Sequence, residues 1–136
     1  MHLCVVTPTA IVVDEDVLDV YAPGAVGELG VLPDHITFLG VLESGEIRYR
    51  GAKGAGSLVM SGGVVEVVND VVTILADDAL APRNVDVEVA RQDLAEAEGL
   101  LATGDPMSPE HEAALGLRRW AQVRIAAAER PPGASH

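Results

Sequence analysis

Residues 61–77 have the sequence SGGVVEVVNDVVTILAD, and this stretch decides the fold of the first part of the chain. Two valine-rich runs flank Asn69-Asp70, a pair that tolerates the positive φ angles of a tight hairpin turn. The Ser-Gly-Gly sequence at 61–63 predicts a bend or a β-bulge just before the first run. The valines around Glu66 predict a strand that is buried on much of both faces.

Short β-branched runs continue from this hairpin back through the N-terminal part of the chain. They are divided by Gly, Pro, Asp or Asn at a spacing of roughly 8–12 residues, which is typical of an antiparallel sandwich or barrel. The predicted strands are 3–6, 10–13, 17–22, 36–42, 46–50, 57–60, 63–68 and 71–75. The sequence therefore predicts an N-terminal antiparallel β-sandwich domain at 1–83.

Near residue 82 a helical period replaces the strand pattern. Apolar residues now recur at steps of three and four, which is typical of amphipathic helices. One stripe consists of Val87, Ala90, Leu94, Ala97 and Leu101, and the other of Ala114, Leu117, Ala121, Ile125 and Ala128. Gly104 lies where the first helix stops, and Ser108-Pro109 begins the second as N-cap and first-turn proline.

The two stripes predict a C-terminal antiparallel two-helix hairpin at 84–136 with a frayed end. Their small alanines allow the helices to pack closely. A hairpin of this size has little core of its own, so it must lie on the sandwich or on a partner to be stable. That dependence allows more than one position for the hairpin.

The composition excludes several classes of partner. Among 136 residues, 21 acids oppose nine lysines and arginines, which gives a net charge of −12. Nucleic acid and a bare anionic membrane are excluded because both need clustered basic residues. No apolar run reaches the ~18 residues of a membrane span, so we expect a membrane link only through partners. The single Cys4 cannot form an internal disulfide, which fits a reducing compartment.

Motifs for catalysis, metal binding or cofactor binding are missing from the sequence. The GAKGAGS stretch at 51–57 lacks phosphate-loop spacing, so it is predicted to be a flexible hairpin loop. The four histidines are scattered, whereas a zinc site needs closely spaced ligand pairs. No nucleophile and base can be named together. We therefore expect a protein without a catalytic residue, a metal or a cofactor.

The stretch GELGVLPDH at 27–35 is the most distinctive part of the sequence. Glycines bracket a glutamate and a leucine, and a proline then leads into an acid and a histidine. This composition predicts an ordered loop at one end of the β domain. It is either an ordinary strand connection or a recognition loop, since rigid scaffolds often carry binding groups on loops.

Taken together, these motifs resemble the epsilon subunit of F-type ATP synthases, the rotor subunit called delta in mitochondria. The likeness runs from Thr7-Pro8 through 27–35 and 61–77 to the AQVRI stretch at 121–125. The order, the distances and the chain length all fit this family. The resemblance implies a β-sandwich followed by a helix-turn-helix, which is the division found from the residue pattern.

The resemblance also implies a function. The subunit would be a non-catalytic part of the central stalk that couples rotation of the c-ring, driven by protons or sodium, to ATP synthesis. Glu28, Leu29 and His35 would lie in the loop that meets the c-ring, and the other face of the sandwich would pack on the gamma subunit. The protein would sit peripherally at the cytoplasmic face of a bacterial inner membrane, as part of the complex.

The helices of the family are regulatory, and this implies a role for Arg118, Arg119 and Arg124. Extended into the alpha/beta catalytic head, the helices would hinder ATP hydrolysis, and these three arginines suit acidic surfaces there. The alternative is ion pairing within the hairpin to Glu96 and Glu98, with favourable charge near a helix C-terminus. The sequence leaves both interpretations open.

Two positions differ from the family pattern. Some members bind ATP through a D-x-x-R-A motif, but Asp86-Val87-Glu88-Val89-Ala90 has Val89 where the arginine belongs, and valine cannot hold phosphate oxygens. Asp34 replaces the usual glycine before His35. A different class of function, a free-standing sandwich that binds a small ligand or carbohydrate, is disfavoured by the scarcity of aromatic residues.

Overall fold

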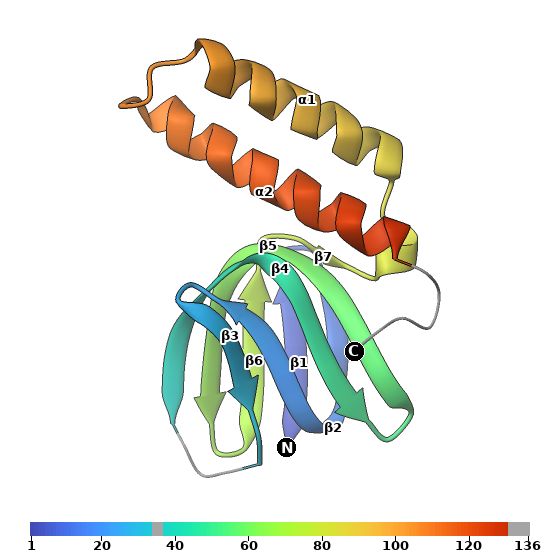
Figure 1. The fold of residues 1–136 in the computed structure, drawn as a ribbon. Coiled ribbons are helices and arrows are strands. Elements are labelled where there is room, and N and C mark those ends of the chain that lie inside the picture. Colours follow the sequence, from blue (N-terminus) through green and yellow to red (C-terminus); the bar gives the residue numbers. More distant parts are fainter. Residues whose placement is uncertain (34–36, 131–136) are drawn as a thin grey trace.

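The computed structural model describes residues 1–33 and 37–130, which form a layered β domain with two helices stacked on one end (Figure 1). The strands are β1 (His2–Thr7), β2 (Ala10–Gly24), β3 (Gly27–Val31), β4 (Phe38–Gly51), β5 (Gly54–Val68), β6 (Val71–Ala76) and β7 (Ala79–Leu80). The helices are the short 3₁₀ helix η1 (Pro82–Asn84), α1 (Val87–Thr103) and α2 (Pro109–Glu129). The predicted order of strands followed by a helical hairpin is confirmed.

The strands form one sheet that closes on itself. Its order is β1-β6-β5-β4-β2-β3, and β1 also pairs with β2, so that the sheet has the two walls of a flattened barrel or sandwich. Strand pairs are antiparallel except β1 and β6, which run parallel. The predicted sandwich is therefore confirmed, with one parallel pair where distant parts of the chain meet to close the sheet.

Three strands are much longer than the sequence predicts. β2, β4 and β5 each join two of the predicted runs, because the backbone bends at the intervening polar or glycine residues without leaving the sheet. In β2 the pairing with β4 shifts register between Val17 and Asp19 and again between Tyr21 and Gly24. Such irregularities let one strand turn the corner between two walls.

The hairpin around Asn69-Asp70 forms as predicted. Asn69 and Asp70 have φ angles of 51° and 64°, as a tight hairpin turn requires. The bend predicted at 61–63 is also present, since Gly62 has a φ angle of +113° within β5. β5 pairs with β6 on one side of this bend and with β7 on the other.

The hydrophobic core lies entirely inside the sandwich. Its largest fully buried side chains come from five different strands, and they include Leu3, Val20, Ile47, Met60 and Ile74. Neither long helix contributes to this cluster. The sandwich therefore has a core that does not depend on the helices.

α2 begins at the predicted cap, Ser108, and α1 begins at a cap that was not predicted, Asp86. The Asp86 side chain accepts hydrogen bonds from the backbone N–H groups of residues 88 and 89, and the Ser108 side chain accepts one from His111. The alanines Ala90, Ala97, Ala114 and Ala121 are buried. Figure 1 shows α2 lying between α1 and the end of the sandwich, where it packs on β4 and β5.

Candidate functional site

The stretch predicted to be a recognition loop is in part a strand. Residues 27–31 form β3, which pairs antiparallel with the end of β2, with Glu28 opposite Pro23 and Leu29 opposite Ala22. The prediction of a loop over the whole stretch is therefore wrong for its first five residues. Glycines disfavour strands, but here Gly30 lies against the ring of Tyr21, where an added Cβ atom would come within 3.0 Å.

The three residues predicted to meet a partner through this stretch differ in their placement. Glu28 is exposed and forms an ion pair with Arg48 at 2.6 Å, and the Arg48 guanidinium lies over the ring of Tyr21. Leu29 is half-buried against the core of the sandwich, so only part of it faces solvent. His35, like the unusual Asp34 before it, lies outside the described residues.

The three arginines predicted as one basic cluster have separate surroundings on α2. Arg119 forms an ion pair with Glu43 at 2.8 Å and donates a hydrogen bond to the carbonyl oxygen of Ser44, which fastens α2 to β4. Arg124 pairs with Asp93 of α1 at 2.8 Å and lies over the ring of Trp120. Arg118 is half-buried and has no ion pair within the described ranges.

The sequence allowed a second interpretation, in which the arginines pair with Glu96 and Glu98 inside the hairpin. The observed ion pairs are different. Arg124 does bind α1, but its partner is Asp93 in place of Glu96 or Glu98. Arg119 forms its ion pair with the sandwich and not with the other helix. In this position of the hairpin, two of the three arginines are therefore occupied inside the molecule.

An exposed apolar row crosses the outer face of the sandwich. Direct cross-strand neighbours connect residues of five strands, which we call the apolar row: Val41, Val64, Leu75, Val6 and Ile11. Val41, Leu75 and Ile11 are 64%, 51% and 66% exposed. Unpartnered apolar surface of this extent marks a candidate interaction face.

Sequence reasoning missed the apolar row. The valines around Glu66 predicted a strand buried on much of both faces, but only Val65 and Val67 are buried, whereas Val64 is exposed. The sequence did contain a signal for this surface, because apolar residues occupy positions that point to both faces of the strand. Because Val64 remains exposed among residues 1–33 and 37–130, such a strand instead indicates a face that another protein can cover.

Two carboxylates of β2 hold His2 at the start of β1. The imidazole Nδ1 lies 2.8 Å from Asp16 and Nε2 lies 2.5 Å from Asp14, which links β1 to β2. These hydrogen bonds, with Asp16 making the larger contribution, raise the pKa of His2 above its ordinary value. The same bond lowers the pKa of Asp16.

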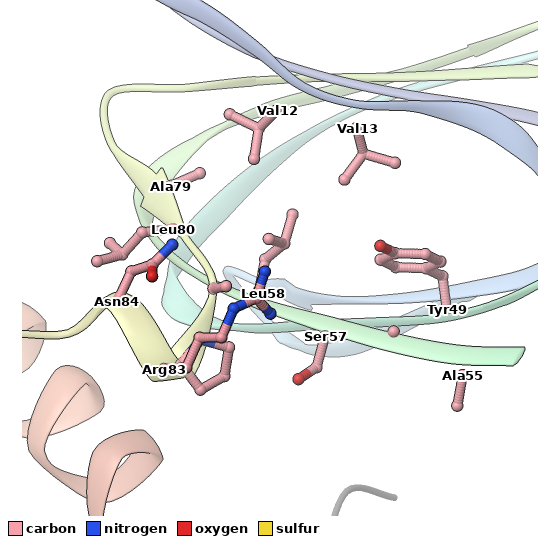
Figure 2. Close-up of a pocket in the computed structure, with 13 residues that line it drawn as sticks. Val12, Val13, Tyr49, Ala55, Ser57, Leu58, Ala79, Leu80, Arg83 and Asn84 are labelled. Carbon is pink, nitrogen blue, oxygen red and sulfur yellow. The ribbon is translucent and has the colours of Figure 1, made fainter. Parts of the chain in front are cut away.

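A cleft of about 520 Å³ opens beside η1, between β2, β5 and β7 (Figure 2). Most of the residues that line it are apolar, but the surface open to solvent is mainly polar, with polar side chains contributed by Tyr49, Ser57, Arg83 and Asn84. No carboxylate, histidine or cysteine is among the described residues that line it, so the cleft offers no acid–base pair. Elsewhere in the described ranges, no group of three or more His, Cys, Asp or Glu side chains is arranged to hold a metal ion.

Comparison with known sequences connects this geometry to a family. The sequence profile of the ATP synthase delta/epsilon chain β-sandwich domain matches residues 1–82. The chain belongs to this family. No helix within residues 1–33 and 37–130 is long and apolar enough to cross a membrane.

Relatives of this delta/epsilon family also align with the helices. The ATP synthase epsilon chain of Nitratidesulfovibrio vulgaris strain DP4 is 41% identical over 126 residues, which cover 92% of this chain and 94% of the relative. The chloroplastic epsilon chain of Cyanidioschyzon merolae is 32% identical over 88% of this chain and 92% of its own length. The epsilon chain of Vesicomyosocius okutanii is 43% identical, but the match spans 62% of that relative.

Solved structures share the fold. A chain of the Tetrahymena thermophila mitochondrial ATP synthase central stalk and c-ring superimposes with a TM-score of 0.69 at 16% identity, covering 94% of this chain and 96% of that one. A chain of the Euglena gracilis mitochondrial ATP synthase gives a TM-score of 0.66 at 24% identity, covering 90% and 73%. At these identities the likeness establishes the fold.

Some epsilon-family members carry an ATP-binding motif at the position of residues 86–90. In this chain Asp86 caps the helix α1. The Asp86 carboxylate accepts the first backbone N–H groups of α1 at 3.1 and 3.2 Å. Val89, at the position of the motif's arginine, is exposed on the first turn of the helix.

Proposed function

We propose that this chain is the epsilon subunit of an F-type ATP synthase, a non-catalytic part of the central stalk. The observation that carries the proposal is the 41% identity to an ATP synthase epsilon chain over both the sandwich and the hairpin. The subunit couples rotation of the c-ring to ATP synthesis. It is held at the cytoplasmic face of a bacterial inner membrane through its partners.

The apolar row is the proposed face for the gamma subunit. It lies across five strands and exposes large apolar side chains, as the centre of a protein–protein interface does. Covering it would remove from water the apolar surface that this chain leaves unpartnered. The second partner surface is the 27–35 stretch, where the exposed Glu28 is the described residue best placed to meet the polar loops of the c-ring.

The helical hairpin, residues 84–136, is the proposed regulatory part, and residues 1–83 are the coupling part. In the position described here, Arg119 and Arg124 are paired with Glu43 and Asp93. Release of the hairpin would free them to bind acidic surfaces of the alpha/beta catalytic head, together with Arg118. Docking on the sandwich and binding to the head would then be mutually exclusive, and the second would inhibit ATP hydrolysis.

The proposal is tested by assembly and ATPase measurements on the catalytic head with its gamma subunit. The full-length chain is expected to co-purify with the head and lower the ATPase rate. A chain cut after Arg83 keeps the complete core, so it is expected to co-purify equally well and to leave the ATPase rate higher. If the cut chain inhibits as much as the full chain, the regulatory role is wrong. If neither chain binds gamma, the whole assignment is wrong.

A further inference from the structure

Four side chains of alternating charge connect the end of α2 to β3. Arg130, which follows α2, pairs with Oε2 of Glu46, and Oε1 of the same carboxylate lies 3.9 Å from Nε of Arg48. Arg48 then donates to Glu28 on β3 at 2.6 Å. Arg130, Glu46 and Arg48 are 29%, 22% and 27% exposed, so these charges are screened less than freely solvated ones.

Within this chain of charges, Glu46 is shared between two arginines. Each of its oxygens faces a different guanidinium, and the nearer cation is Arg130. Arg48 is restrained over the ring of Tyr21, with its guanidinium carbon 5.3 Å from the ring centre, and it approaches Glu28 more closely than Glu46. Arg48 thus lies between the carboxylates of Glu28 and Glu46. Arg130 partly neutralises Glu46, so its presence weakens the attraction of Glu46 for Arg48.

The contact between α2 and the sandwich at this end is incompletely packed. A hollow of about 180 Å³ lies beneath the ion pair, lined by Glu46, Val59, Val123, Ala126, Ala127 and Arg130. At this end α2 contributes Val123 and two small alanines, of which Ala126 is exposed and Ala127 is buried, and the ion pair of Arg130 lies beside them.

We propose that docking of α2 and the hold on Glu28 are coupled through Glu46 and Arg48. While α2 is docked, Arg130 neutralises Glu46, and Arg48 remains with Glu28. When α2 leaves, Glu46 keeps Arg48 as its one cation within 4 Å among the described residues, and it draws Arg48 away from Glu28. The coupling is a property of the chain by itself. Its meaning for c-ring contact rests on the proposed function.

Backbone amide hydrogen exchange in the full chain tests the coupling. Arg130→Gln removes the cation that occupies Glu46, so the amides of β3 are expected to exchange about two- to fivefold faster, as loss of an ion pair of ordinary strength would give. In the double variant Glu46→Gln, Arg130→Gln the neutral side chain no longer attracts Arg48. The exchange rates of β3 are therefore expected to return to those of the wild type.

Arg91→Gln is the matched control, because Arg91 pairs with Glu129 at the same end of the hairpin but does not touch Glu46. The exchange rates of its β3 amides should equal those of the wild type.

The amides of β6, which lie in the core, report global unfolding. The coupling is refuted if Arg130→Gln leaves β3 unchanged, if β3 and β6 accelerate by the same factor, or if the double variant stays as fast as the single one. Because no ATP synthase is present, the outcome is independent of the proposed function.

Discussion

Gly62 allows a single strand to serve two parts of the sheet. Its φ angle of +113° is rarely adopted by residues with a side chain, and it sits where β5 changes partner from β7 to β6. Leu42 and Ser44 of β4 flank the same position on the other side. The Ser-Gly-Gly sequence therefore encodes a bend that the closed sheet needs.

Gly62→Ala is expected to destabilise the protein by about 1–3 kcal/mol, because alanine must adopt this strained conformation. Urea unfolding measures the change. Gly99→Ala is the control, since it lies in α1 with open space around it and should stabilise the helix by about 0.5–1 kcal/mol. Equal stability of the Gly62→Ala variant and the wild type would contradict the role assigned to the bend.

His2 makes the stability of the sandwich depend on pH. Its pKa is raised above 6.5 by Asp16 first and Asp14 second, so the stabilisation is complete below 6.5 and is lost as pH rises through the raised value. The pKa of Asp16 is lowered from 3.8, so its contribution is present above 3.8 and is lost as pH falls through the lowered value. The contacts of His2 with Asp14 and Asp16 therefore stabilise the sandwich most between pH 3.8 and pH 6.5.

His2→Gln is expected to lower the free energy of unfolding more at pH 5 than at pH 9, because only at pH 5 is the imidazole charged beside both carboxylates. Urea unfolding at the two pH values gives the comparison. In an Asp16→Asn background the same substitution should show a smaller pH dependence. An equal loss at pH 5 and pH 9 would mean that His2 acts through packing and not through its charge.

Among the elements, the helical hairpin depends most on small side chains. Ala97 of α1 and Ala121 of α2 are completely buried, and α1 packs mainly against α2. Each alanine lets the backbones approach closely, as helices with small residues at their contacts do. The polar contacts of Arg119 and Arg124 then fix where the hairpin lies.

Ala97→Leu is expected to destabilise the hairpin by about 1–3 kcal/mol, since a larger side chain in a filled contact forces the helices apart. Amide exchange of α1 and α2 should accelerate, whereas that of the sandwich, whose core is separate, should not. Ala95→Leu, at an exposed position of the same helix, should have little effect. Equal effects of the two substitutions would argue against close helix packing at Ala97.

At the scale of the whole molecule, the apolar row and the docked hairpin occupy different parts of the surface of the sandwich. The hairpin covers the end of the sandwich at β4 and β5, whereas the apolar row lies on an outer face that it leaves open. A bound gamma subunit would therefore leave the hairpin free to dock or to be released.

Leu75→Glu places a charge in the centre of the apolar row. Binding to gamma is expected to weaken about 30-fold or more, because burying this carboxylate without a partner costs about 2 kcal/mol or more. Titration of the variant with gamma measures the affinity. Leu18→Glu, at an exposed position outside the row, should bind as the wild type does. Unchanged affinity of the Leu75 variant would place the gamma face elsewhere.

The sequence by itself determined the elements whose signals are local. The Asn69-Asp70 turn, the cap at Ser108 and the helical stripes all depend on neighbours a few residues apart, and they were predicted correctly. The cap at Asp86 is equally local but was not predicted. Glu28 and the arginines could be named as candidates because the sequence motifs resemble a known family. Their partners could not, because Glu28 meets Arg48 and Arg119 meets Glu43 across long stretches of chain.

Tertiary structure alone decided how these elements are used. It made a strand of 27–31, because pairing with β2 outweighs the weak strand preference of its glycines. It joined the predicted short runs into three long strands and left Val64 in the open, since which face of a strand is covered depends on what packs there. Burial and charge pairing are set by distant segments meeting in space, which no local pattern in the sequence encodes.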